Sequence, residues 1–150
     1  MITIRPHNPA KAYLQRYRYA LARYQSLARA IVELRETLTG TTQALRPDPV
    51  SGGGGQDRMA GVVARIADME AELSDALADL DAQLKEIVAA IEAVPDETQR
   101  AVLTMRYIEG MDWNGIQARL NYEKTQIFVI HGRALVAVNQ WLQTADENGL

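Results

Sequence analysis

The residues best suited to chemistry in this 150-residue chain lie in its last third, directly after a predicted tight turn at Asn121-Tyr122. Lys124, Thr125 and Gln126 follow that turn at the start of a predicted helix, and Arg133 lies further along it. Side chains of these types in the first turns of a helix donate hydrogen bonds to base edges and phosphates. A helix N-terminus also attracts phosphate. The pattern therefore predicts recognition of a nucleic acid rather than a reaction.

Three further residues extend this candidate interface. Arg106 and Arg119 are suited to phosphate contacts, but solvated helix residues are the favoured interpretation of both, and the phosphate role stays open. Phe128 can meet the methyl group of thymine, although an aromatic residue at helical spacing is more often part of a core or a protein interface. The complete candidate set for DNA binding is Lys124, Thr125, Gln126, Phe128, Arg133, Arg119 and Arg106.

No pattern in the sequence indicates catalysis or a metal site. There is no Ser-His-Asp, Cys-His or paired-carboxylate arrangement, so we expect no enzyme, no catalytic residue and no cofactor. The chain has no cysteine, and His131 and His7 each lack a partner at metal-ligand spacing, so no metal is expected. The acids from Asp68 to Asp81 have the spacing of a solvated helix face. Gly52 to Gly55 lack the remainder of a phosphate-loop motif, which leaves a flexible linker as the better interpretation.

A helix-turn-helix must position the candidate residues. We expect a first helix opened by Pro95 in its first turn and ended by Glu109-Gly110, since glycine tolerates the left-handed conformation there. Asp112 should cap a short helix from Trp113 to Leu120, and a last helix should then run to about Gln143. The residues predicted to face inward are Val102, Leu103, Met105, Tyr107, Trp113, Ile116, Leu120, Ile127, Ile130, Ala134, Leu135, Val138 and either Trp141 or Leu142.

Two long helical patterns precede this module, over residues 9–39 and 58–94. Each has apolar residues at alternating spacings of three and four, which predicts one seam that packs against another helix. Residues 40–57, with two prolines and four consecutive glycines, should form a mobile loop, and Asp57 should cap the second helix. The seam residues are Leu14, Tyr17, Leu21, Tyr24, Ala28, Ile31, Leu34 and Leu38 in the first pattern, and Val62, Ile66, Met69, Leu73, Leu77, Leu80, Leu84, Ile87, Ile91 and Val94 in the second.

Charge supports an antiparallel pairing of these two helices. Residues 1–46 carry eight basic and two acidic side chains (+6), residues 47–94 three and ten (−7), and residues 95–150 five and seven (−2), which sums to the net charge of −3. Arg16, Arg18, Arg23 and Arg29 should therefore flank the seam opposite the acids between Asp68 and Asp81. Pairing between two chains would satisfy the same pattern and stays open.

Composition bounds the remaining possibilities. The hydrophobic share of 47% is sufficient for a core, and no apolar run approaches the ~18 residues of a membrane helix. The first residues lack the apolar stretch of a secretory signal, and the absence of cysteine fits a reducing compartment, so we expect a cytoplasmic protein. We predict an all-α fold with a helical hairpin at 1–94, a helix-turn-helix at 95–143 and a polar tail at 144–150.

Four segments carry a family resemblance: Val102-Leu103-x-x-Arg106-Tyr107-Ile108-x-Gly110, Asp112-Trp113-x-x-Ile116, Leu120-Asn121-Tyr122 and Ile127-x-x-Ile130-His131-Gly132-Arg133-Ala134-Leu135. With them, residues 95–138 resemble region 4 of bacterial sigma factors and, more narrowly, the phage late-gene transcriptional activators of the RinA/ArpU type. The chain departs from that pattern at Gln117, where a small residue is usual, at Asn121, where glycine is usual, and at Glu123, where serine is usual.

The resemblance implies a sequence-specific DNA-binding regulator that activates phage or prophage late genes with host RNA polymerase, in the cytoplasm of a bacterial host. The implied partners are double-stranded DNA, bacterial RNA polymerase and further copies of the chain, with no membrane. Two alternatives stay open: a small terminase-like subunit that recognises a phage start site for DNA packaging, and a helical adaptor that binds no DNA. Residues 95–143 contain five basic and five acidic side chains, so we expect few net phosphate contacts and a modest salt dependence.

Overall fold

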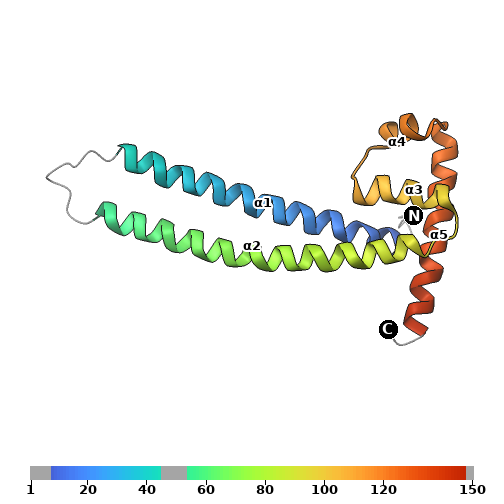
Figure 1. Ribbon diagram of the computed structural model, residues 1–150, viewed down its shortest axis with the longest axis horizontal. Coiled ribbons are helices and arrows are strands. Elements are labelled where there is room, and N and C mark those ends of the chain that lie inside the picture. Colours follow the sequence, from blue (N-terminus) through green and yellow to red (C-terminus); the bar gives the residue numbers. More distant parts are fainter. Residues whose placement is uncertain (1–7, 45–53, 148–150) are drawn as a thin grey trace, which may run out of the picture. The chain divides into compact units, whose positions relative to one another are not determined.

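A computed structural model describes residues 8–44 and 54–147 (Figure 1). They form five α-helices and one π-helical turn: α1 (Pro9–Ala44), α2 (Gly54–Glu92), α3 (Glu97–Leu103), η1 (Thr104–Ile108), α4 (Trp113–Leu120) and α5 (Lys124–Glu147). These residues contain no strand, so the predicted all-α fold class is confirmed. None of the helices described is both long enough and apolar enough to span a membrane.

The long helices extend further than the sequence predicted. α1 continues to Ala44 and α2 begins at Gly54, so both ends of the expected loop at 40–57 are helical. Glycine disfavours a helix by only about 1 kcal/mol, against about 3 kcal/mol for proline, and so is tolerated near helix ends. Asp57 consequently lies in the first turn of α2 instead of capping it. At the other end, α5 continues to Glu147 through most of the expected tail. His7 and residues 45–53 of the expected loop lie outside the described residues.

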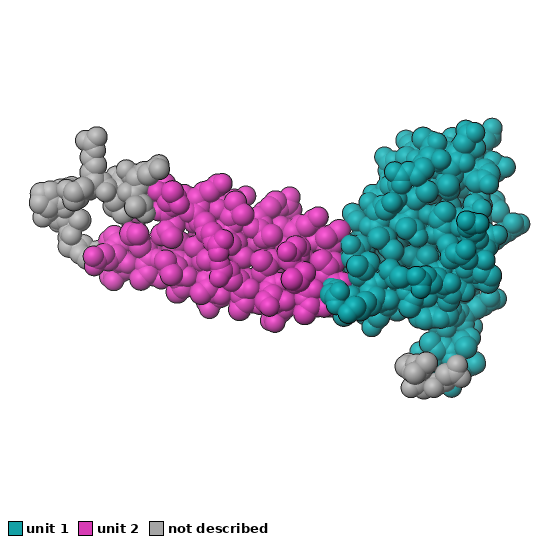
Figure 2. Space-filling model, viewed as in Figure 1, with its two compact units in different colours: residues 1–20, 81–150 teal, residues 21–80 magenta. Residues whose placement is uncertain are grey.

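The chain divides into two compact units (Figure 2). Unit 1 comprises residues 1–20 and 81–150, and unit 2 comprises residues 21–80. The sequence predicted a border between residues 94 and 95 instead. The units divide the chain differently because the beginning of α1 and the end of α2 share a hydrophobic core with the helix-turn-helix.

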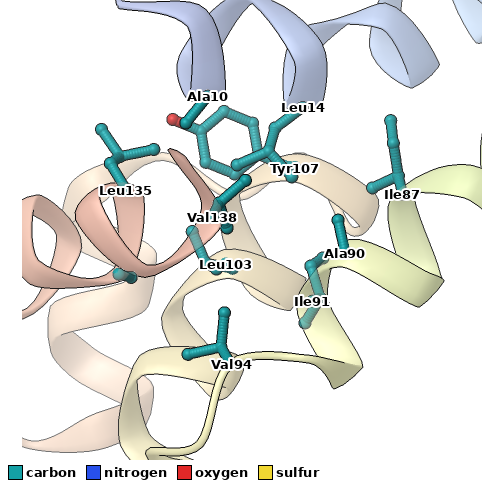
Figure 3. Close-up of a cluster of buried hydrophobic side chains, with 11 residues drawn as sticks. Ala10, Leu14, Ile87, Ala90, Ile91, Val94, Leu103, Tyr107, Leu135 and Val138 are labelled. Atoms are coloured by element: carbon teal, nitrogen blue, oxygen red, sulfur yellow. The ribbon is translucent and has the colours of Figure 1, made fainter. Parts of the chain in front are cut away.

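The main core of unit 1 joins these elements (Figure 3). Leu14 of α1, Ile87 of α2, Leu103 of α3 and Val138 of α5 are fully buried in it. Its edge is closed by partly buried Tyr13 and Trp141, whose rings lie 6.3 Å apart. The Arg16 guanidinium also lies 3.3 Å from the Glu86 carboxylate. The helix-turn-helix is therefore anchored on paired segments of α1 and α2 rather than standing alone.

A second, smaller core of unit 1 supports the candidate interface directly. Val102 of α3, Ile116 of α4 and Ile127 of α5 are each fully buried in it. Partly buried Trp113, Leu120 and Ile130 pack against them. All six residues were predicted to face inward, so the apolar support of the helix-turn-helix is as the spacing indicated.

Unit 2 is a helical pair built from the remainder of α1 and α2. Ile31 of α1 is buried against Ile66 and Met69 of α2, with Leu34, Leu38, Val62 and Leu73 partly buried around them. Arg35 of α1 forms an ion pair with Glu70 of α2. A basic helix is thus paired with an acidic one, as predicted, but through other residues. Arg35 was not among the arginines expected to flank the seam, and in unit 1 Arg16 pairs with Glu86, outside the acids from Asp68 to Asp81.

Two details of the predicted seam are wrong. Leu77 is 51% exposed, and Ala76 is buried in its place. The seam advances four residues from Met69 to Leu73 and then three to Ala76. Ala76, one position before Leu77, therefore satisfies the same alternation of three and four. Arg18 was expected to face the acids of α2, but its guanidinium donates to the carbonyl of Ile108 at 3.2 Å.

Candidate nucleic-acid interface

The turn between α4 and α5 places the start of α5 in solvent. Asn121 lies in the predicted tight turn and has the left-handed conformation, with φ 56° and ψ 41°. Its N–H donates to the carbonyl of Gln117 at 2.9 Å. The Glu123 N–H donates to the Gln126 side chain at 3.2 Å, which satisfies one free donor of the helix start. Every residue from Asn121 to Gln126 is exposed. The turn therefore presents a continuous polar run at a helix N-terminus.

Side-chain caps fix the helices that support this turn. Asp112 accepts a hydrogen bond from the Gly115 N–H at 2.7 Å, which confirms the predicted cap of α4. Asp96 accepts from the Gln99 N–H at 2.8 Å and caps α3. The sequence predicted Pro95 in the first turn of this helix, but Pro95 precedes the cap. Asp96 occupies the cap position because its carboxylate accepts a hydrogen bond from a free N–H group, which a proline side chain cannot do.

The link from α3 to α4 passes through the π-helical turn η1 and Gly110. The Glu109 N–H donates to the carbonyl of Thr104 at 3.0 Å, which closes the wider π turn. Gly110 then has φ +71°, as predicted for a residue that ends a helix. A Cβ atom on Gly110 would also collide with the Arg18 guanidinium. Glycine is thus favoured here by its backbone conformation, whereas the flexible Arg18 side chain could move aside.

A cluster of rings lies behind the exposed turn. Trp113 meets Phe128 edge-on at 5.2 Å and His131 edge-on at 4.8 Å. The Arg106 guanidinium lies over the Trp113 ring, 4.5 Å from its centroid. A hydrogen bond of 2.7 Å joins the Tyr107 hydroxyl and Nε2 of His131. The cluster therefore fixes the orientation of Phe128 at the protein surface.

Burial keeps the two hydrogen-bonded rings of this cluster neutral. It lowers the pKa of His131 to about 4, assisted by the positive charges of Lys11 and Arg106. It also raises the pKa of Tyr107 to about 12, with Arg106 opposing the shift. His131 thus has a structural partner in Tyr107, and no group of metal-binding residues occurs in the part of the chain that the structure describes.

The structure separates the basic residues of the module into two classes. Arg106 donates to the carbonyl of Met111 at 3.0 Å, and Arg119 pairs with Glu109 at 2.9 Å. Arg100, which was not a candidate, donates to the carbonyls of Val94 and Pro95. Within residues 8–44 and 54–147, the two other cations of the module, Lys124 and Arg133, form no hydrogen bond or ion pair. Both are exposed.

A hollow of about 430 Å³ lies beside the first turns of α5. Its walls come from the start of α3, the turn before α5 and α5 itself. Three of the predicted interface residues, Thr125, Gln126 and Arg133, line it together with Asp96, Thr98, Gln99, Tyr122, Val129 and Ile130. The hollow thus unites three of the seven candidates, while the side chains of Arg106 and Arg119 are engaged elsewhere in unit 1.

The family described as "Protein of unknown function (DUF1492)" matches residues 41–139. The chain belongs to this family. No curated protein and no solved structure matches it. The DUF1492 region spans α2, α3, α4 and most of α5, and it includes all seven candidate residues.

Two features of the candidate interface in the DUF1492 region were not predicted from the sequence. Val129 and Tyr122 line the hollow, but neither was among the seven candidate residues. Trp113 was expected to face inward, yet it also supports Phe128 and His131. The spacing of Phe128 and His131, three residues apart on one helix, places both on the same side and was the available signal for a shared ring partner.

Proposed function

We propose that this chain is a sequence-specific DNA-binding transcriptional regulator in which the first turns of α5 enter the major groove. The observation that supports it most is the exposed run from Asn121 to Gln126, at the N-terminus of a helix seated on a buried tripod of Val102, Ile116 and Ile127. A recognition helix needs this combination, because its tip must reach base edges while its other side stays fixed.

The free cations of the module suit the two ends of such an interface. Lys124 and Arg133 have no partner among the described residues and can pair with phosphates. Their nine-residue separation corresponds to about 13.5 Å along the helix axis, or the length of about four base pairs. The helix between them therefore has room to meet base edges while both ends hold the backbone.

Two polar residues are suited to base contacts. The Gln126 side-chain oxygen accepts from the Glu123 N–H, which leaves its NH2 group to donate to an acceptor on a purine edge or to O4 of thymine. Thr125 lies beside it, exposed, and offers both a hydroxyl and a methyl group. In this proposal Arg106 and Arg119 stabilise the helix-turn-helix and do not contact DNA, since their guanidinium groups already bind the carbonyl of Met111 and the carboxylate of Glu109.

The biological setting rests on the resemblance to sigma region 4 and to the RinA/ArpU-type activators. It supports a role in activating phage or prophage late genes together with bacterial RNA polymerase. Footprinting on the genome that encodes the chain, with and without RNA polymerase, tests this setting. Protection just upstream of a late operon supports it, and protection confined to a DNA-packaging start site contradicts it.

DNA reading by α5 is tested with Lys124→Gln and Arg133→Gln. Duplexes are first enriched from a random library with the full chain, and affinity is then measured across a salt series. Each substitution should weaken binding and reduce the slope of log K against log salt by about 0.9, the value of one phosphate contact. Lys85→Gln is the matched control, because Lys85 is an exposed lysine of unit 1 outside the helix-turn-helix. No enrichment, or unchanged slopes in both variants, would show that α5 does not read DNA.

A further inference from the structure

The outward face of α5 is apolar over two turns beyond its polar tip. Val129 is 48% exposed and Val136 is 55% exposed. Gly132 lies between them and is also exposed. Steps of three and four residues place these positions on one side of the helix, directly behind Thr125. A fold that buries the other side of α5 thus leaves an apolar strip on the side proposed to face DNA.

Phe128 borders this strip, and its ring is both exposed and fixed in orientation. Its ring is 46% exposed, yet its other side meets Trp113 edge-on at 5.2 Å. Trp113 in turn is held by Arg106 and His131. An exposed aromatic ring that is already fixed loses little conformational freedom on binding, which favours a specific contact.

The neighbouring charges indicate what the strip contacts. Lys124 precedes the strip in the sequence of α5, and Arg133 follows Gly132 at its border. Both side chains are exposed and have no partner among the residues described. A purely apolar protein surface would leave these two cations facing a low-dielectric contact, which is unfavourable. The major groove instead combines flanking phosphates with one apolar group on its base edges, the C5 methyl of thymine.

We propose that Phe128 and Val129 make the chain select thymine, by contacting its C5 methyl group in the major groove. This inference rests on the proposed function, since it requires α5 to enter that groove. Gly132 contributes by leaving the strip without a side chain at its centre. A Cβ atom there would meet nothing within 4 Å in the described structure, so the chain's own contacts do not require glycine at this position.

The test replaces each thymine of the enriched duplex with deoxyuridine, which lacks only the methyl group. One or two positions should lose about four-fold in affinity, as expected for one apolar methyl withdrawn from contact. In Val129→Ala and Phe128→Ala that loss should shrink toward none at the corresponding position. Val63→Ala is the matched control, because Val63 is a helical valine of unit 2 with 54% exposure. Circular dichroism establishes that each variant is folded, and Val129→Ala serves if Phe128→Ala is not.

The outcomes separate this inference from the proposed function. If deoxyuridine changes nothing at any position while Lys124→Gln still weakens binding, thymine selection is wrong and DNA reading by α5 stands. If no duplex is enriched, the proposed function itself fails. If Val129→Ala dissociates an oligomer in sedimentation and leaves the deoxyuridine loss unchanged, the strip is a contact between copies and thymine selection is overturned.

Discussion

Gly132→Ala should raise the stability of the chain and weaken its binding to DNA. Gly132 is exposed in the interior of α5, and a Cβ atom there would contact nothing within 4 Å of the described structure. Alanine in place of glycine in a helix interior stabilises by about 1 kcal/mol. For a chain of this size that corresponds to a rise in Tm of roughly 2–4 °C.

Binding should change in the opposite direction because the added methyl group lies on the strip proposed to face DNA. Forcing one extra methyl group into a close contact typically costs about 1–3 kcal/mol, which is roughly five-fold to a hundred-fold or more in Kd. The separation of the two effects is diagnostic, since a damaged fold would lower both stability and affinity.

Gly61→Ala is the matched control. Gly61 is also exposed and helical, with nothing within 4 Å of its Cβ position, but it lies in α2 of unit 2. It should therefore produce a similar gain in helix stability with no change in Kd. Thermal unfolding and titration of a fluorescent duplex measure both quantities. Equal affinities for the Gly132→Ala chain and the wild type would refute close approach of DNA to α5 at this position.

Three other perturbations have expected outcomes. Gly110→Ala should destabilise the chain by about 1–2 kcal/mol in urea unfolding, because alanine is strained at φ +71° and its Cβ would displace Arg18. Folded His131 has a pKa of about 4 against 6.5 unfolded, so the unfolded chain binds more protons between those values. Stability should therefore fall as pH drops from 6.5 to 4, by on the order of 2 kcal/mol after solvent screening, and His131→Gln should remove most of this dependence. Glu123→Gln should raise DNA affinity about three-fold at low salt and hardly at all at high salt, since it removes a carboxylate that would face phosphate in the proposed complex. A salt-independent change would contradict the electrostatic explanation.

The turns of the helix-turn-helix could be predicted because their causes are local. Asn121 and Gly110 are residue types that tolerate positive φ, and Asp112 is a strong cap, so a few neighbouring residues determine each conformation. The buried residues of α5 followed from periodicity, since one side of an amphipathic helix must face the core.

The roles of the arginines could not be predicted in the same way. Arg106 and Arg119 occupy helix positions that are compatible with DNA contacts, but their partners, the carbonyl of Met111 and the carboxylate of Glu109, depend on how η1 returns toward α4. The shared core of unit 1 escaped prediction for a similar reason. Ala10 and Leu14 contact residues more than seventy positions away, and a periodic pattern does not identify its partner.

The small number of free cations constrains how such a module could regulate transcription. With Lys124 and Arg133 as its phosphate contacts, one chain would have a slope of about −1.8 in log K against log salt. A four-fold rise in salt would then reduce affinity only about twelve-fold, but the electrostatic affinity at low salt would be small as well.

Base contacts through Thr125, Gln126, Phe128 and Val129 would supply specificity without supplying much total affinity. Stable occupancy would consequently require a second source of binding energy, either another copy on an adjacent half-site or RNA polymerase, and a two-copy complex would double the slope to about −3.6. Assistance by RNA polymerase would leave the slope of the chain alone near −1.8, so these two routes to regulation differ in an observable property of the DNA complex itself.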